Sequence, residues 1–294
     1  MATPSLLDYA ALSAIIYNDI RSDKNKLTNS PSGWSQILDD SNAGFSAGAY
    51  RNGNDIVIAY KGSDNLQADV NGGLDWSTNL LSFLGAGSPQ VVSAALFYEA
   101  VKAANPGANI TFTGHSLGGG MASLMAVYFD RPATTFDQAP FLATAANPVF
   151  TGYVGLALAA NGIGDASFSD FAGSLGLLTG FRSSNVQDYF VPGEAVSYIR
   201  GAASGIYGSD TPIPVGGGDA ISTSAITNAV ALHSMTLAAA LLIQRKFQND
   251  TIALPSLLAS AAPATTTSLA ASGRGVVSTG SGAPAIGGNG GFAR

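Results

Sequence analysis

A glycine–serine–glycine pattern at residues 114–118 constrains the fold of this chain more than any other feature. The five residues read G-H-S-L-G, after a β-rich run at 109–113 and before an apolar stretch at 121–129. A serine between two glycines, on a sharp turn from a strand into a helix, forms a nucleophile elbow with its hydroxyl at the tip of the turn. The free N–H groups of such a helix start also favour an anion. We therefore predict a strand–turn–helix unit with Ser116 as a candidate nucleophile.

A serine hydroxyl is a weak nucleophile unless a base takes its proton. The chain has only two histidines, His115 and His233. His115 lies beside the serine within the turn, where its side chain points away from the serine hydroxyl. His233 follows the acidic candidates, in the order serine, acid, histidine that is typical of this kind of site. By elimination, we predict that His233 is the general base.

The third member of such a site is a carboxylate between Ser116 and His233, just past a strand. Glu194 follows the apolar run 189–191 by two turn residues, at the carboxyl end of a predicted strand, where the sites of α/β proteins form. We predict Glu194 as the acid, with Asp210 and Asp219, in glycine-rich loops, as open alternatives. The other aspartates are less suitable. Asp188 lies inside a predicted strand, Asp130 and Asp137 come too early in the chain, and Asp165 and Asp170 lie in an apolar segment.

The composition argues against several other kinds of site. Only 11% of the residues are charged, the net charge is −6, and lysine and arginine form no cluster, so we expect no nucleic-acid partner. The absence of cysteine excludes disulfides, thiolate metal sites and a cysteine nucleophile. Two histidines disfavour a multi-histidine metal site. We expect no cofactor and no metal, because a serine–histidine–acid triad needs neither.

Helix and strand signals alternate along most of the chain, which predicts an α/β fold with a mostly parallel sheet flanked by helices. The run D-I-V-I-A-Y at 55–60 is typical of a strand buried on both faces. Expected helices span 3–17, 75–84, 90–104, 121–129 and 225–247, and the other expected strands span 47–50, 109–113, 141–145 and 186–191.

Two segments differ in composition from the rest. Residues 256–294 are rich in alanine, serine and glycine and carry two charges, so we expect a low-complexity tail after a domain at 1–255. Residues 151–180 are rich in glycine, alanine, leucine and phenylalanine. This insert is either a lid or acyl-binding wall that meets a lipid surface, or an ordinary helical excursion, and its periodicity does not separate the two.

Several motifs together resemble those of the class 3, fungal-lipase-like family of α/β-hydrolases. Residues 60–63 (Y-K-G-S) are similar to the family's R-G-S or R-G-T at a strand end, with lysine for arginine. Residues 75–79 contain its D-W and asparagine, and 114–119 match its elbow. Residues 192–196 (P-G-E-A-V) are similar to its N-D-x-V acid loop, with glutamate for aspartate. His233 matches its last catalytic residue, and the resemblance covers roughly residues 5–247.

The resemblance implies an α/β-hydrolase fold, with the elbow after a central strand and with the nucleophile, base and acid identified above. It also implies an oxyanion hole formed by the backbone N–H groups of Ser63 and Leu117. The implied activity is that of a serine carboxylester hydrolase of lipase type, which cleaves acyl esters through an acyl-enzyme and needs no cofactor.

Two other functions remain open: a phospholipase A1-type effector or toxin, and a non-catalytic lipid-binding module on a hydrolase scaffold. For partners, we expect an acyl-ester substrate and transient contact with a lipid interface, but no stable protein partner. The low charge favours acyl chains over polar substrates. Residues 1–19 lack the basic start of a signal peptide, so secretion is expected by a route without one, and a cytoplasmic location is the alternative.

Overall fold

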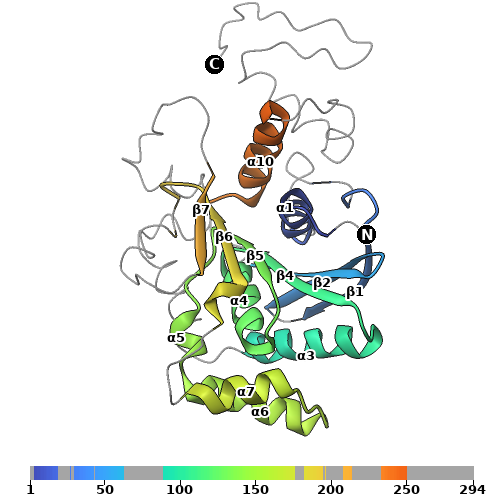
Figure 1. The fold of residues 1–294 in the computed structure, drawn as a ribbon, viewed down its shortest axis with the longest axis vertical. Coiled ribbons are helices and arrows are strands. Elements are labelled where there is room, and N and C mark those ends of the chain that lie inside the picture. The colour runs from blue at the N-terminus through green and yellow to red at the C-terminus, as the bar shows by residue number, and fades with distance from the viewer. Residues whose placement is uncertain are drawn as a thin grey trace, which may run out of the picture.

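A seven-stranded sheet forms the centre of the part of the chain that the structure describes, with its strands in the spatial order β1 to β7 (Figure 1). The computed structural model describes residues 3–18, 27, 30–42, 44–62, 89–175, 182–194, 196, 208–213 and 233–249. The strands are β1 (Ser35–Asn42), β2 (Phe45–Asn52), β3 (Asp55–Tyr60), β4 (Asn109–His115), β5 (Ala133–Phe136), β6 (Val186–Phe190) and β7 (Ser209–Pro212).

The sheet is antiparallel at one side and parallel from β3 onward. Strand β2 pairs antiparallel with both β1 and β3, whereas β3 to β7 pair parallel to one another. The register aligns Tyr60 with Gly114, His115 with Phe136, and Phe136 with Tyr189. The carboxyl ends of four neighbouring strands therefore lie side by side, which is where parallel sheets build their sites. This topology confirms the predicted α/β-hydrolase fold.

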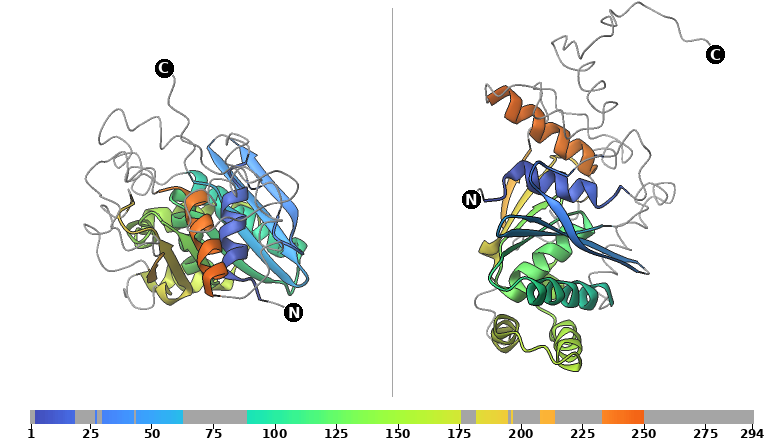
Figure 2. Two further views of the ribbon diagram at one scale, coloured as in Figure 1. Left: turned by 90° about the horizontal axis from the view of Figure 1, so that it is seen from above. Right: turned by 90° about the vertical axis from the view of Figure 1, so that its right-hand side faces the viewer.

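Helices cover both faces of the sheet, and one face carries an additional outer layer (Figures 1 and 2). Helices α1 and α10 lie on one face, and α3 and α4 lie on the other, with α6 and α7 outside them. The bounds are α1 (Leu6–Ile15), α3 (Pro89–Ala104), α4 (Leu117–Phe129), α5 (Leu142–Ala145), α6 (Pro148–Ala160), α7 (Ala166–Ser174) and α10 (Met235–Asn249), and a 3₁₀ turn, η4, spans Ser183–Asn185.

The structure contains three strands that the sequence did not predict, β1, β5 and β7, and two predicted elements differ from the observed ones. The predicted helix at 3–17 begins later, as α1, because the Ser5 side chain and Asp8 form a reciprocal capping box at its start. The segment 141–145 was predicted as a strand but contains the short helix α5, since the Ala145 N–H donates to the Phe141 carbonyl at 2.9 Å. The predicted helix at 75–84 and the tail at 256–294 lie outside the described residues.

Two hydrophobic clusters hold the layers together, one on each face of the sheet. All six residues of β3 are buried, as expected of a strand covered on both faces. All thirteen residues of α4 are also buried, which a helix lying directly under solvent could not achieve. The covering layer is α7, whose Phe168 and Phe171 rings lie 5.4 and 5.1 Å from the Tyr128 ring of α4. The described part of the predicted insert is thus a pair of helices, the second of which packs against α4; the lid interpretation stays a prediction.

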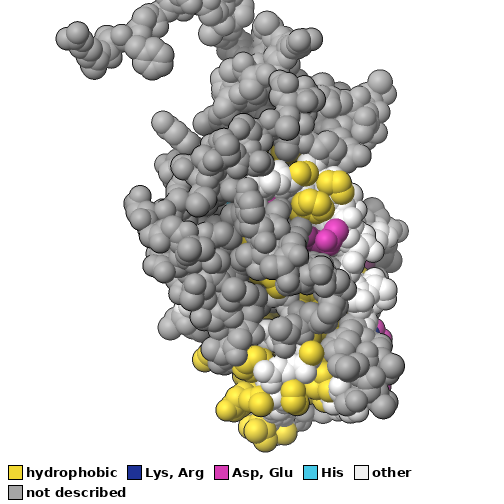
Figure 3. Space-filling view, turned by 90° about the vertical axis from the view of Figure 1, so that its left-hand side faces the viewer, with side chains coloured by type: hydrophobic (Ala, Val, Ile, Leu, Met, Phe, Trp, Pro, Cys, Tyr) yellow, Lys and Arg dark blue, Asp and Glu magenta, His cyan; other side chains and the backbone are white. Residues whose placement is uncertain are grey.

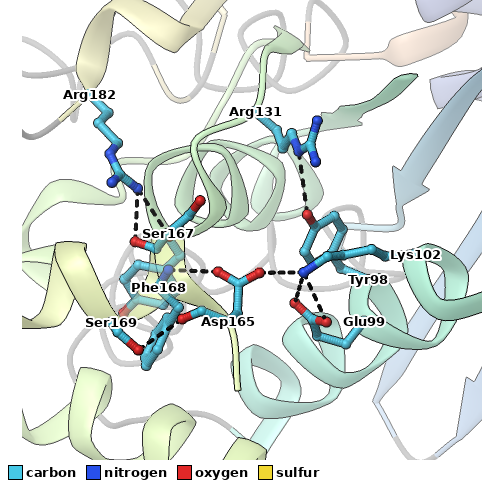
Figure 4. A network of polar contacts seen from close by, with 10 residues as sticks. Tyr98, Glu99, Lys102, Arg131, Asp165, Ser167, Phe168, Ser169 and Arg182 are labelled. Carbon is cyan, nitrogen blue, oxygen red and sulfur yellow. Dashed lines mark hydrogen bonds and ion pairs between the residues drawn. The ribbon is translucent and has the colours of Figure 1, made fainter. Parts of the chain in front are cut away.

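A network of charged side chains joins α3 to the start of α7 (Figure 4). Lys102 donates to Glu99 at 3.2 Å and also to Asp165, which caps α7 by accepting the Phe168 N–H at 2.7 Å. Burial by itself would raise the pKa of Asp165, but the hydrogen bonds from Lys102 and Phe168 outweigh it and lower that pKa. Burial raises the pKa of Glu99, against the opposing effect of Lys102. The network therefore anchors the outer helices by pairing opposite charges.

The outer surface of α6 carries an apolar stripe. Val149, Tyr153 and Leu156 are 57, 56 and 70% exposed, and hydrophobic side chains gather over the lower end of the molecule where α6 and α7 lie (Figure 3). Among the residues that the structure describes, no helix is both long enough and apolar enough to cross a membrane.

Candidate active site

Ser116 lies between β4 and α4 in a backbone conformation that L-residues rarely adopt. Its φ is 58° and its ψ is −126°. The surrounding backbone enforces this strained turn, because the Ser116 N–H donates to the Phe136 carbonyl at 3.1 Å. The Ser116 carbonyl accepts from the N–H groups of Ala139 and Gly120 at 2.9 and 3.0 Å. The serine is therefore fixed at the tip of a strand-to-helix turn, as the sequence pattern predicts.

The two glycines of the pattern are required by close backbone approach. A Cβ on Gly114 would lie 2.3 Å from the Gly118 carbonyl oxygen, and a Cβ on Gly118 would lie 2.1 Å from the Tyr60 carbonyl oxygen. Neither position accommodates a side chain without moving the strand, the helix or β3. The spacing of the motif thus reflects how tightly β4, α4 and β3 cross at this point.

The structure brings His233 and Glu194 into direct contact, although 39 residues separate them in the sequence. His233 lies just before α10, and its Nδ1 is 2.6 Å from Glu194 Oε2. Glu194 ends the turn that follows β6, with Gly193 at φ 82°. The Glu194 carboxylate also accepts the Val196 N–H at 2.6 Å. Because an ionised carboxylate only accepts hydrogen bonds, His233 Nδ1 is the donor of this bond, and in the neutral imidazole Nε2 is the nitrogen that can accept a proton.

The remaining polar ends of the serine and the histidine are buried and without a partner among the described residues. Ser116 Oγ and His233 Nε2 both lack a hydrogen bond, although such atoms are normally satisfied in a folded protein. They belong to one locality, because the ring of His115, next to the serine, lies 4.5 Å from the ring of His233. A hydroxyl donor and an imidazole acceptor are thus both available at this end of the sheet.

The predicted oxyanion hole is described in part. Leu117 is the first residue of α4, where backbone N–H groups have no partner within the helix. Ser63 lies outside the described residues, but the preceding Gly62 adjoins the elbow. A Cβ on Gly62 would lie 2.7 Å from the His115 carbonyl oxygen and 3.3 Å from the Gly118 nitrogen. The end of β3 therefore approaches the start of α4 closely.

The structure describes two of the other aspartates considered as the acid. Asp188 is buried within β6, where it accepts the Thr135 hydroxyl at 2.9 Å. Asp210 is exposed on β7. Asp219 lies outside the described residues.

Asp137, which the sequence analysis set aside as too early in the chain, is part of this locality. It directly follows β5, is fully buried and has φ 44°. Its Oδ2 lies 3.9 Å from His115 Nε2. Strand β5 has the sequence A-T-T-F, which contains no apolar run. The sequence therefore predicts no strand end beside Asp137.

The chain is similar to several known proteins. A family model described as a Tle-like phospholipase domain matches residues 8–247. The chain is 33% identical over 102 residues to the extracellular phospholipase A1 of Serratia liquefaciens. That match covers 35% of this chain and 30% of the relative, so the chain matches less than a third of that protein.

Solved structures of fungal lipases are similar at low sequence identity. The lipase of Rhizomucor miehei in its propeptide complex shares 16% identity over 79% of this chain and 76% of that chain, with a TM-score of 0.42. The lipase of Rhizopus microsporus var. chinensis shares 15% identity over 80% of this chain and 86% of that chain, with a TM-score of 0.43.

Proposed function

The chain belongs to the Tle-like phospholipase family, and on that premise we propose that it is a serine hydrolase of phospholipid acyl esters. One observation carries the proposal: the buried His233–Glu194 pair, 2.6 Å apart, lies at the same strand ends as a strained serine whose hydroxyl has no described partner. A hydrolytic triad needs an oriented, unprotonated imidazole nitrogen near a serine hydroxyl.

The proposed reaction follows the serine-hydrolase sequence. Ser116 Oγ attacks the ester carbonyl while His233 Nε2 takes the hydroxyl proton, and Glu194 holds the imidazolium that forms. The backbone N–H groups of Leu117 and Ser63 bind the oxyanion. The alcohol leaves as lysophospholipid with the proton from His233, and water then hydrolyses the acyl-enzyme to release the fatty acid and restore Ser116.

The phospholipid substrate is proposed from the family and from the named relative. The relative is a phospholipase A1, so we place the first cleavage at the sn-1 ester. We also place the site of action outside the producing cell, as for the extracellular relative. Release of dye from phospholipid vesicles measures action on intact bilayers, which the effector or toxin interpretation requires.

The test is hydrolysis of p-nitrophenyl esters from C2 to C16, and of a phospholipid labelled separately at sn-1 and sn-2. We expect wild-type turnover at sn-1 and a fall of about 10⁴-fold or more in Ser116→Ala. Ser35→Ala, at an exposed position on β1, is the matched serine control and keeps full activity. Ester turnover in Ser116→Ala at the wild-type rate would exclude this mechanism.

The apolar stripe of α6 is the proposed contact with the lipid surface. Leu156→Glu places a charge where the side chain is 70% exposed, so we expect weaker binding to phospholipid vesicles and no change on soluble esters. Gln36→Glu adds the same charge to the exposed face of β1 as a control. Equal vesicle binding by both variants would remove α6 from the interface.

A further inference from the structure

A second carboxylate lies beside the proposed base. Asp137 directly follows β5, which the sheet places between β4, the strand that carries the serine, and β6, the strand that leads to Glu194. Its side chain is fully buried, and its backbone has φ 44°. Burial of a carboxylate and a positive φ at a non-glycine residue both reduce the stability of the fold. The contacts that Asp137 makes therefore indicate its role.

One oxygen of Asp137 holds the turn that carries the acid. Its Oδ1 accepts the Val191 N–H at 2.7 Å, and its own N–H donates to the Tyr189 carbonyl at 2.9 Å. The Val191 carbonyl in turn accepts the Glu194 N–H at 3.1 Å. Asp137 is thereby linked to the position of Glu194 through a single residue.

The other side of the carboxylate faces the two imidazole rings. Oδ2 lies 3.9 Å from His115 Nε2, and an oxygen of Asp137 lies within 4.8 Å of a ring nitrogen of His233. The two rings lie 4.5 Å apart at an angle of 38°. The carboxylate therefore lies close enough to both rings to interact with a positive charge on either of them.

We propose that Asp137 is a second acid for the base: it stabilises the positive charge that His233 gains on taking the serine proton, and it fixes the Glu194 turn. This inference rests on the proposed function. Asp137 acts on the base and does not touch substrate, so it is a positioning and charge-stabilising residue. A charge within 5 Å in a water-poor site acts strongly on its neighbour.

Other titratable groups lie at or near His233 and remain constant in the test. Glu194 approaches from the turn after β6, and His115 from the end of β4. Behind His115, the Tyr17 hydroxyl lies 3.4 Å from its Nδ1. Lys61 is buried at the end of β3, next to the Gly62 that adjoins the elbow.

The decisive variant is Asp137→Asn, which keeps an amide oxygen for the Val191 N–H and removes the charge. Asparagine tolerates positive φ, so the variant suits the local backbone. We expect kcat to fall about tenfold with KM unchanged, and the acid limb of the kcat/KM profile to move to lower pH. The limb moves that way because the base holds a proton less firmly once the second negative charge is gone.

A matched control separates charge from packing. Asp188→Asn neutralises another fully buried aspartate, on the neighbouring strand β6, whose carboxylate accepts hydrogen bonds from the Thr135 hydroxyl and the Gln138 N–H. We expect it to lower the melting temperature without moving the acid limb. Asp137→Gly, which also fits the backbone, should reproduce the limb shift of Asp137→Asn with a larger loss of stability.

The two proposals fail in different ways. Ester turnover by Ser116→Ala at the wild-type rate overturns the proposed function itself. If Ser116→Ala is inactive while Asp137→Asn keeps kcat within about twofold and leaves the acid limb in place, only the role of Asp137 is overturned.

Discussion

Two clusters of charged and titratable side chains lie in different parts of this molecule, and the carboxylates in them have different partners. Between α3 and α7, the carboxylates of Glu99 and Asp165 face the ammonium of Lys102. At the strand ends, the carboxylates of Glu194 and Asp137 face imidazole rings and backbone N–H groups. The first cluster pairs charges that are permanent at neutral pH. The second surrounds a ring that acquires its charge only when it takes a proton.

The two clusters differ in whether they should contribute to the stability of the fold or to turnover. The Lys102 cluster joins helices by placing one ammonium between two carboxylates, so its loss should affect folding. The His233 cluster keeps a buried nitrogen and a buried serine hydroxyl without a described partner, so its loss should affect turnover. Each variant below tests whether one cluster affects stability and the other affects turnover.

His233→Ala has the largest expected effect on turnover. Without the imidazole no group takes the Ser116 proton, so we expect kcat to fall by about 10⁴-fold or more. The melting temperature should also fall, because the variant leaves the buried Glu194 carboxylate without its imidazole partner. We would measure kcat and the melting temperature on the same preparation. Appreciable ester turnover by this variant would show that another group is the base.

Glu194→Gln should have the next largest effect. The amide keeps the shape of the side chain but removes the charge that stabilises the imidazolium, so we expect kcat to fall by about 10²- to 10⁴-fold with a modest effect on KM. Glu194→Asp is the charge-preserving comparison and should retain more activity. Steady-state kinetics on a soluble ester measure both, and equal activity of the amide and the wild type would exclude Glu194 as the acid.

Lys102→Ala tests the other cluster. It leaves the carboxylates of Glu99 and Asp165 without their shared ammonium, which should cost about 1–2 kcal/mol of stability after allowance for solvent screening at a side chain that is 35% exposed. We expect a fall of roughly 2–4 °C in Tm and unchanged kcat. A loss of activity matching that of the site variants would show that the two clusters are coupled.

Asp165→Asn gives the smallest effect and carries a pH signature. The pKa of Asp165 is lowered in the folded chain, so its carboxylate stabilises the fold above the ordinary value of 3.8, and that contribution is lost as the pH falls through the folded value. The Tm difference between wild type and Asp165→Asn should therefore narrow as the pH falls below 3.8. A constant difference across that range would contradict the assigned charge.

Much of this arrangement could be predicted from the sequence because its signals are local or few in number. The G-x-S-x-G turn follows from close backbone crossing, and with only two histidines the order serine, acid, histidine leaves few combinations. That reasoning placed Glu194 and His233 together, and the structure brings them into contact. Their catalytic roles stay predictions.

Two of the strands that escaped prediction lack a hydrophobic signature. Strand β5 is A-T-T-F and β7 is S-D-T-P, so neither shows a run of apolar residues. Their pairing comes from neighbouring strands, which the sequence alone does not reveal. Asp137 was set aside as too early in the chain, and without β5 no strand end was expected beside it. The reverse error at 141–145 arose because an apolar run of five residues fits a strand and a helical turn equally well.

The positive φ of Ser116 affects how the stability of this chain can be raised by laboratory selection. Such a conformation costs a non-glycine residue about 1–3 kcal/mol, in a protein whose whole margin against unfolding is roughly 5–15 kcal/mol. Selection for thermal stability alone would favour glycine at position 116. The selected variants would be more stable but catalytically inactive. A screen for durable variants of this chain must therefore score turnover at every round.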